Sequence, residues 1–277
     1  MLAFVHIEKA AGTTLIHILR RNFFPRYMDV NPLVREGGRS LTSRDLRIAR
    51  RVNPFLSVIG GHSVTSHSDL ESLYPDIRYV VVFRDPVERY ISQFKYWNRH
   101  LGKGVSFEQF LDDEATWNVQ TKKIAGSADS GAAIRELDSK FLLAGVVEQF
   151  DEFLLLLEKR LEPFAFDPRY TVQNQTKSGV KDASSVRLDE YRAEIAARNT
   201  ADVELYKHVV ETLMPRQVAD YGDDFGKNLI AFQAAKTVGA NNTVRYLDYG
   251  LRKAYVQPVT GLIRRLNGLP YRGSYRK

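Results

Sequence analysis

Three short segments of the sequence carry side chains that can hold an anion or move a proton. The first, residues 8–14, reads Glu-Lys-Ala-Ala-Gly-Thr-Thr. Small residues let backbone N–H groups turn toward an anion, and a helix that begins here adds its positive end. Lys9 adds a charge, and Thr13 and Thr14 add hydroxyl donors. The segment therefore predicts a phosphate cradle, with a solvated strand-to-helix turn as the alternative.

A second anion site is indicated at Arg84, which directly follows the apolar run 77–83. A guanidinium at the end of a buried strand needs a partner, and a phosphate bound through two hydrogen bonds is a suitable one. An ion pair with Asp85 or Glu88 is the alternative. Ser92 lies eight residues after Arg84, two turns into a predicted helix, where a serine can also be a simple packing residue.

The third segment is Gly60-Gly61-His62, with His67 five residues further on. A histidine beside glycines at the mouth of a cleft can act as a general base, since its pKa lies near neutrality. A capping or packing role for His62 is the alternative. No metal site is expected, because the chain has no cysteine and no carboxylate pattern completes a set with the two histidines.

Each of the three segments follows a predicted strand. Ligands bind beyond the carboxyl ends of the strands in an open parallel sheet, so the segments should meet at one edge. The pattern predicts an α/β fold with a P-loop-like, mainly parallel central sheet flanked by helices. Strands are expected at 2–7, 55–60, 77–83 and 141–147, and helices at 13–24, 43–52, 86–100, 107–125, 148–161 and 188–214.

The helix at 86–100 has the clearest start signal, because Asp85 stands at the N-cap, Pro86 at the first position and Glu88 at the third, as in a capping box. Residues 26–54 are otherwise predicted to be a polar loop. Helices are also expected at 229–237 and 244–256, whereas the last twenty residues are expected to be irregular.

Charge separates the end of the chain from the rest. The formal net charge is +7 over 277 residues, yet residues 236–277 contain nine Lys/Arg and one acidic residue. We therefore predict a main domain at 1–225 and a basic extension at 226–277 that is not an independent domain. Basic and apolar residues interleave over 240–277, which indicates contact with a membrane surface or a polyanion; no nucleic acid partner is expected.

No apolar run approaches the ~18 residues that a membrane-spanning helix needs. The expected location is therefore cytoplasmic, with peripheral membrane contact through residues 240–277 as a further expectation.

Taken together, these segments resemble the sulfotransferases that use 3′-phosphoadenosine 5′-phosphosulfate (PAPS), specifically the carbohydrate group related to heparan sulfate 2-O-sulfotransferase. FVHIEKAAGTTL is similar to that group's 5′-phosphosulfate loop, VVVFRDPVERYISQF to its 3′-phosphate motif, and GGH to the segment with its base histidine. Glu8 departs from the family's usual proline. The resemblance covers residues 3–215, with weaker similarity at 118–121, 145–153 and 199–206.

The resemblance implies a sulfuryl transfer from PAPS to a hydroxyl of an acceptor, most simply a carbohydrate, with adenosine 3′,5′-bisphosphate as the second product and no metal. His62 is the implied general base and Lys9 the residue that stabilises the leaving group. The implied nucleotide ligands are Lys9, Ala11, Gly12, Thr13, Thr14, Arg84 and Ser92, with Lys177 closing from a loop. Tyr96, Trp97 and Arg99 are candidates for an acceptor groove, although core packing suits Trp97 better.

Two other function classes stay open from the residues alone. A P-loop-like nucleotide kinase or other phosphotransferase fits the cradle, but Lys9 precedes Gly12, so the Walker A spacing is absent. A non-catalytic protein that binds a polyanion or a membrane surface through residues 240–277 fits the basic extension.

Overall fold

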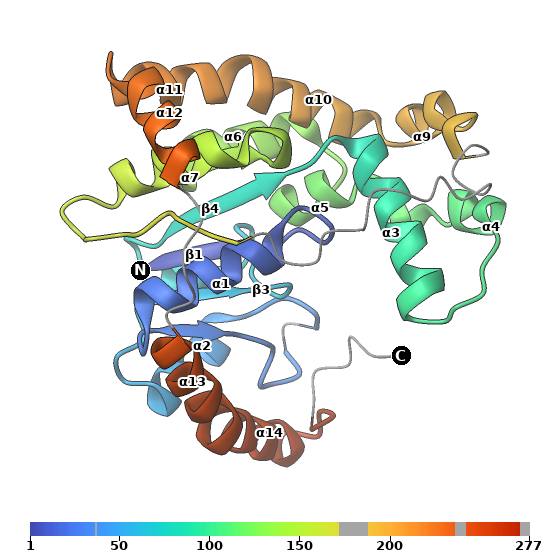
Figure 1. Cartoon of the computed structure of the whole chain (residues 1–277). Helices are drawn as coiled ribbons and strands as arrows, with labels where there is room; N and C mark the ends of the chain where they lie inside the picture. The colour runs from blue at the N-terminus through green and yellow to red at the C-terminus, as the bar shows by residue number, and fades with distance from the viewer. Residues whose placement is uncertain (37, 172–187, 236–241, 272–277) are drawn as a thin grey trace.

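A five-stranded parallel sheet forms the centre of the protein (Figure 1). The structure is a computed structural model, and it describes residues 1–36, 38–171, 188–235 and 242–271. The strand order is β2-β3-β1-β4-β5, and every neighbouring pair is parallel. The predicted α/β fold is confirmed. The strands are β1 (Leu2–Val5), β2 (Tyr27–Asp29), β3 (Val58–Gly61), β4 (Arg78–Phe83) and β5 (Phe141–Val146).

The helices cover both sides of this sheet and continue past its β5 edge. The first group is α1 (Gly12–Phe23), α2 (Ser43–Val52), α3 (Pro86–His100), α4 (Phe107–Asp112), α5 (Val119–Ala125), α6 (Ser130–Lys140) and α7 (Phe150–Arg160). The second group is α9 (Arg192–Arg198), α10 (Thr200–His208), α11 (Met214–Tyr221), α12 (Phe225–Ala235), α13 (Asn242–Leu251) and α14 (Gln257–Leu266). Among these described helices, none has the length and apolar content to cross a bilayer.

Burial on both faces explains the central strands. All four residues of β1 are buried, and so are Tyr79–Phe83 of β4. Continuous apolar runs of this kind suit a parallel sheet covered by helices on both faces. α1 packs against β2 and β3, while α6, α7 and α11 pack against β5 (Figure 1). Because the strands are parallel, the loops after β1, β3 and β4 lie along one edge.

Local capping fixes where two helices begin. Thr42 and Asp45 form a reciprocal capping box at α2, which occupies the predicted residues 43–52. The Asp85 carboxylate accepts a 2.9 Å hydrogen bond from the Glu88 backbone N–H at the start of α3. The other half of the expected capping box does not form, because the Glu88 carboxylate pairs instead with Arg192 at 2.6 Å.

Two expectations about the elements are wrong. The predicted loop 26–54 contains β2, whose three residues are too few to give a recognisable alternation pattern. The predicted helix 107–125 is divided into α4 and α5, because Asp113 ends α4 with extended backbone and Asn118 takes a left-handed conformation with φ of 52°. Neither conformation can continue an α-helix.

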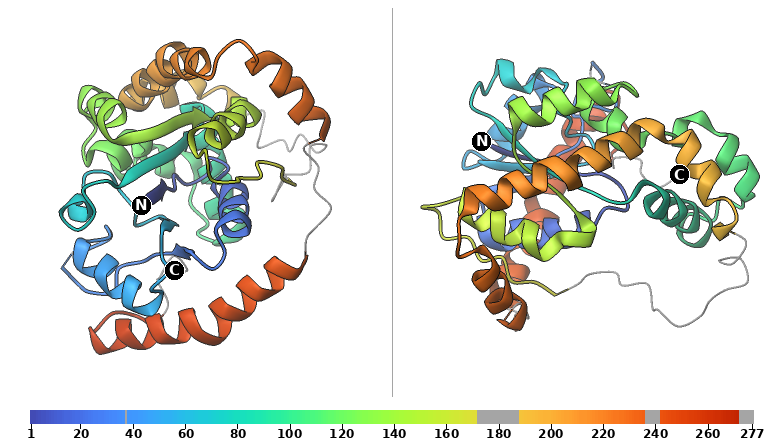
Figure 2. Two further views of the ribbon diagram at one scale, coloured as in Figure 1. Left: turned by 90° about the vertical axis from the view of Figure 1, so that its left-hand side faces the viewer. Right: turned by 90° about the horizontal axis from the view of Figure 1, so that it is seen from above.

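The C-terminal segment packs along the body of the protein. α12 contacts α7, α13 contacts α1, and α14 contacts α2. Figure 2 shows α13, the π-helical turn Arg252–Val256 and α14 as one continuous helical arm. The expected irregular end is therefore wrong for residues 257–266, where Pro258 occupies the first turn that tolerates it. Buried Arg264 fastens the arm by donating to the carbonyl oxygens of Pro32 and Pro270.

Candidate functional site

The loop after β1 turns sharply to start α1. Lys9 and Ala11 have φ values of 68° and 54°, which place both in the left-handed region. Left-handed residues between right-handed ones turn successive backbone N–H groups toward one side and form an anion-binding concavity. No side chain caps α1, although the Thr14 N–H already donates to the Ala11 carbonyl oxygen at 3.0 Å. The predicted phosphate cradle therefore has the backbone geometry that such a role needs.

Arg84 reaches this loop from the end of β4. Its Nη1 donates to the Lys9 carbonyl oxygen at 3.2 Å. Gln120, fully buried at the start of α5, holds the Arg84 backbone from both sides, accepting from its N–H at 3.0 Å and donating to its carbonyl at 2.9 Å. The structure thus brings together two cations that lie 75 residues apart in sequence.

Lys9 is held in a crowded, partly buried position. Its Nζ lies 4.3 Å from the centre of the Tyr96 ring. Burial, and then the neighbouring Arg84 charge, lower the pKa of Lys9, while Glu8 opposes that change. Tyr96, a candidate for the acceptor groove, therefore lies beside the lysine, whereas Trp97 packs in a T-shaped contact against Phe110.

Arg89 is a third cation at this edge, and the sequence analysis did not select it. It is only 1% exposed on α3, and its Nε has no hydrogen-bond partner within the part of the chain that the structure describes. Burial lowers the pKa of Arg89, which Asp202 and Glu8 partly offset and Arg84 reinforces. Within the described ranges, no carboxylate lies within 4 Å of Lys9, Arg84 or Arg89. A buried, unneutralised guanidinium is costly unless an anion completes its surroundings.

His62 follows β3 and stacks on His6, which follows β1. The two ring centres are 4.0 Å apart and the rings are inclined by 23°. The His62 Nδ1 lies 3.9 Å from Glu8 Oε1, and the His62 side chain is 30% exposed. Burial lowers the pKa of His62, and Lys123 lowers it further, whereas Glu8 raises it. At neutral pH the ring is therefore uncharged and able to accept a proton.

Lys123 is the second residue of this site that the sequence analysis missed. It lies on α5 and its Nζ donates to the His62 carbonyl oxygen. Burial lowers the pKa of Lys123 to about 8, against the influence of Glu8. Glu8 thus acts electrostatically on Lys9, Arg89, His62 and Lys123 together.

Two glycines allow this arrangement. A Cβ on Gly12 would lie 2.0 Å from the His6 ring, so any other residue at the start of α1 would displace that ring and the His62 stacked on it. Gly61 has φ of 144° and lies against the Val30 carbonyl oxygen, where a Cβ would come within 2.8 Å. Both glycines are required by close approach, and Gly61 also by its backbone conformation.

The remaining predicted residues lie at different depths. Thr14 is buried and Thr13 is exposed at the start of α1. Ser92 is partly buried on α3, and no hydrogen bond within the described residues joins it to Arg84. His67 turns away from the cradle, with Nδ1 3.1 Å from the Ile124 carbonyl oxygen. Lys177 lies outside the described residues.

Residues 118–121 and 199–202 support the site through hydrogen bonds to each other. Asp202 at the start of α10 accepts from the Thr121 N–H at 2.7 Å and hydroxyl at 2.8 Å, and from the Gln120 N–H at 3.2 Å. The Asn118 N–H donates to Asn199 Oδ1 at 2.8 Å, and the Asn118 side-chain amide donates to the Arg198 carbonyl oxygen at 3.3 Å. Residues 118–121 and 199–202 therefore fix Gln120, which in turn holds Arg84.

Residue spacing gave only a faint signal for the residues that were missed. Arg89 is followed in the sequence by Tyr90 and Ile91. A charged residue next to apolar residues of a helix is a candidate for a functional role, for the same reason as Arg84 at the end of its strand. Nothing in the sequence near Lys123 points to His62, because 61 residues separate them.

No protein-family model matches this sequence, and no curated protein matches it. Among the described residues, no three His, Asp or Glu side chains gather as a metal-binding group. The site itself combines cations with the stacked pair His6 and His62 and the Glu8 carboxylate at the carboxyl edge of a parallel sheet in an α/β protein.

Proposed function

We propose that this protein is a PAPS-dependent sulfotransferase that transfers a sulfuryl group to a hydroxyl of an acceptor, with a carbohydrate as the acceptor class. The observation that carries the proposal is the contact between Arg84 and the Lys9 carbonyl at the edge of the sheet. It supports two neighbouring anion sites, one on the cradle of α1 and one on the end of β4. A donor with phosphates at its 5′ and 3′ positions needs two such sites.

The nucleotide ligands follow from this geometry. The 5′-phosphosulfate is proposed to bind the backbone amides of Ala11–Thr14 and the ammonium of Lys9. Arg84 and Ser92 are proposed to bind the 3′-phosphate, and Arg89, which is buried on α3, is proposed to add positive charge near them. Three cations without a carboxylate partner in the described residues suit a ligand with several negative charges. Lys177 is proposed to close over the nucleotide.

The proposed reaction is an in-line displacement. The acceptor hydroxyl loses its proton to His62 while its oxygen forms a bond to sulfur. The bond between sulfur and the 5′-phosphate oxygen breaks, and its electron pair leaves with that oxygen. Lys9 stabilises the charge that develops there, so adenosine 3′,5′-bisphosphate and a sulfate ester are released. A neutral His62, favoured by burial and Lys123, is the form that this step needs.

Glu8 has a positioning role in the proposed reaction. It stands where the similar family has proline, and its carboxylate lies 3.9 Å from His62 Nδ1. When His62 takes the proton, Glu8 stabilises the imidazolium. This pairing of a carboxylate and a histidine is a general way to make imidazole a better base.

The test is a calorimetric comparison of two nucleotides. We expect adenosine 3′,5′-bisphosphate to bind at least tenfold more tightly than ADP, and Arg84→Ala to remove this preference. The matched control is Arg78→Ala, because Arg78 is exposed at the opposite end of the same strand. Equal binding of the two nucleotides by the native protein contradicts the proposal, and magnesium-dependent turnover of ATP would favour the kinase alternative.

A second candidate activity, binding to an anionic membrane surface, is favoured by the exposed side of the C-terminal arm. Leu262 and Leu266 are 56% and 78% exposed, and Leu247 and Tyr255 are also exposed. Lys253 and Arg265 are exposed on the same arm. Apolar side chains beside basic ones suit the interface of an anionic bilayer.

This membrane contact is tested by co-sedimentation with vesicles. We expect binding to vesicles with about 30% phosphatidylserine, weaker binding to pure phosphatidylcholine, and loss of binding in Leu262→Ser/Leu266→Ser. Ile230→Ser is the control, because Ile230 is equally exposed but lies on α12. Equal loss in both variants, or no binding by the native protein, contradicts the membrane contact. The proposed location is accordingly the cytoplasm, with this arm at the membrane surface.

A further inference from the structure

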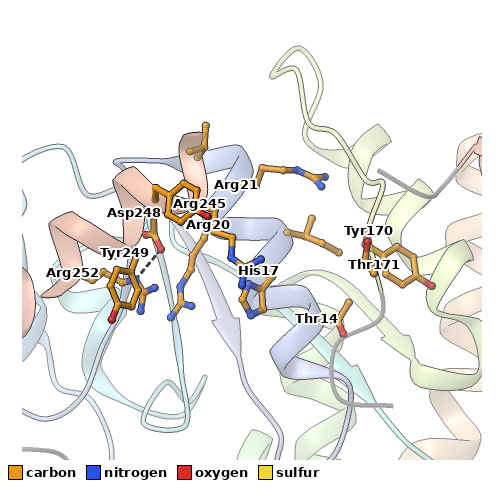
Figure 3. A pocket seen from close by; sticks show the side chains of 13 residues that line it. Thr14, His17, Arg20, Arg21, Tyr170, Thr171, Arg245, Asp248, Tyr249 and Arg252 are labelled. Atoms are coloured by element: carbon orange, nitrogen blue, oxygen red, sulfur yellow. Dashed lines mark hydrogen bonds and ion pairs between the residues drawn. The ribbon is translucent and has the colours of Figure 1, made fainter. Parts of the chain in front are cut away.

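A cavity in the described part of the chain lies outside the candidate site at the carboxyl edge of the sheet. It measures about 510 Å³ and lies between α1 and α13, with one wall formed by Tyr170 and Thr171. We call it the α1–α13 pocket. Figure 3 shows His17 and Arg20 of α1 at its centre, between the α13 side chains and the segment at Tyr170. A cavity of this size suits a small ligand or a few units of a longer one.

The pocket is rich in guanidinium groups. Arg20 pairs with Asp29, Arg252 donates to Asp248 at 2.8 Å, and Arg21 lies 3.5 Å from Asp167. Asp167 is shared with Arg169, which lies just outside the lining residues. Arg245 is the fourth arginine of the lining and has no ion-pair partner among the described residues. Four guanidinium groups and one carboxylate, that of Asp248, line the pocket, so its lining is positive.

The positive charge acts on His17, whose side chain is exposed on α1 and lines the pocket. Partial burial lowers the pKa of His17, and Arg20, Arg245 and Arg252 lower it further, while Asp248 acts in the opposite direction. The cations therefore converge on one space, although they come from segments more than 220 residues apart. An anion in this space would relieve the repulsion among them.

Aromatic rings form the other part of the lining. Tyr246 and Tyr249 of α13 are 69% and 56% exposed, although both border the cavity. Flat rings with a polar hydroxyl suit the faces and hydroxyls of a sugar ring. The basic side chains reach from Arg21 on one side to Arg252 on the other (Figure 3), which suits several spaced acidic groups better than one phosphate.

Two contacts connect the pocket to the proposed transfer site. Thr14 lines the pocket and belongs to the loop proposed to hold the 5′-phosphosulfate. Arg20 pairs with Asp29, and Asp29 in turn raises the pKa of His62 electrostatically. The pocket and the proposed transfer site therefore share the first turn of α1.

We infer that the α1–α13 pocket binds an acidic saccharide, and that residues of the C-terminal extension, Arg245 and Tyr249 above all, supply half of this binding site. Its identification as the sulfate acceptor rests on the proposed function. The binding of an acidic saccharide does not, because it follows from the charge and the rings of the pocket alone. The extension is thereby part of the substrate-binding surface of the main domain.

The test measures binding of a heparin-derived tetrasaccharide by calorimetry to the full-length protein. Arg245→Ala/Tyr249→Ala changes two exposed side chains, so the variant should fold normally, and its melting temperature checks this. Arg265→Ala is the charge-matched control on α14. We expect the double variant to bind at least tenfold more weakly, the control to bind within twofold of the native protein, and neutral maltotetraose to bind at least tenfold more weakly than the acidic probe.

Three outcomes overturn the inference. They are native affinity in the double variant, equal weakening in Arg265→Ala, and loss of adenosine 3′,5′-bisphosphate binding in the double variant. The last would assign the cavity to the nucleotide. If the native protein binds the tetrasaccharide through Arg245 and Tyr249 but binds no adenosine 3′,5′-bisphosphate, the proposed sulfotransferase function fails while the saccharide site stands.

Discussion

The carboxyl edge of the sheet and the α1–α13 pocket are both lined by basic residues, but they hold their charges differently. At the edge, Arg89 is almost fully buried and Lys9 is partly buried, and neither has a carboxylate within 4 Å in the described residues. In the pocket, Arg20 and Arg252 each have a carboxylate partner and Tyr249 is open to solvent.

This difference indicates different kinds of ligand. Buried cations without carboxylate partners are destabilising until an anion arrives, so the edge suits a small ligand of high charge that is enclosed on binding. Cations that already have partners, next to exposed rings, suit a ligand that lies across a surface and is bound less tightly. A donor nucleotide fits the first description and a saccharide fits the second.

The largest expected effect is on kcat, and it tests whether the carboxyl edge of the sheet carries out the chemical step. We expect His62→Ala to lower kcat by about 10²–10⁴-fold, because the acceptor proton loses its base. The affinity for adenosine 3′,5′-bisphosphate should stay the same. The measurement is sulfate transfer from labelled PAPS to a glycan panel, with His67→Ala as the control. If His62→Ala keeps its turnover while His67→Ala loses it, the base belongs to the other histidine.

Substitution of Arg89 should have the next largest effect, which is on nucleotide affinity. It tests whether Arg89 serves ligand binding or the stability of the fold. Arg89→Met keeps the volume but removes the buried charge. We expect adenosine 3′,5′-bisphosphate to bind about tenfold more weakly, with no loss of stability in the free protein. Arg245→Met in the pocket should leave nucleotide affinity unchanged. A loss of about 3–5 kcal/mol in the unfolding free energy of Arg89→Met would instead show that Arg89 serves to neutralise buried Asp202.

The pH profile of kcat/KM tests the charges around His62. Protonation of His62 should lower kcat/KM below about pH 6.5, and the midpoint should lie on the acid side of that value because its pKa is lowered. Glu8→Gln removes a charge that raises this pKa, so the acid limb should move to lower pH, by up to about one unit. Lys123→Met removes a charge that lowers it, so the limb should move to higher pH.

Asp248→Asn in the pocket is the control and should leave the acid limb in place. Shifts in the same direction for Glu8→Gln and Lys123→Met would contradict this account.

The smallest effect concerns stability. Burial, with His62 and Lys123, lowers the pKa of His6 well below 6.5. The unfolded chain therefore binds more protons than the folded chain below pH 6.5, and the unfolding free energy should fall as pH falls through that value. One unit of pKa difference corresponds to about 1.4 kcal/mol. His6→Phe should flatten this dependence in urea titrations at pH 5 and 7, whereas His100→Phe, at the exposed end of α3, should not.

Local patterns were enough to predict much of the fold. The apolar runs at 2–7, 55–60, 77–83 and 141–147 each overlap a strand, because burial on both faces of a sheet requires such runs. α2 and α3 begin at their capping residues, since a cap depends on neighbours within three positions. β2 and the break between α4 and α5 were missed because three residues carry no period and a left-handed Asn has no fixed sequence signal.

The tight loop after β1 could be predicted to a similar degree, but the residues from other elements that contact this edge could not. Lys9, Gly12 and Thr14 lie within six residues, so their spacing predicts a shared loop. Arg84 was selected for its place at a strand end. Gln120, Lys123 and Asp202 come from α5 and α10, and their contacts with the edge depend on how these helices pack.

The sequence by itself determined four of the five strands, the starts of α2 and α3, and that a tight turn of small residues joins the first strand to a helix. Only the tertiary structure decided that Arg84 meets Lys9, that Arg89 lies buried beside them, and that α13 completes a basic pocket on α1. The physical reason is the separation along the sequence over which each signal acts. Caps and periodicity depend on residues a few positions apart. Parallel strands and the C-terminal arm bring together segments that lie far apart in the sequence, so their contacts leave no local pattern.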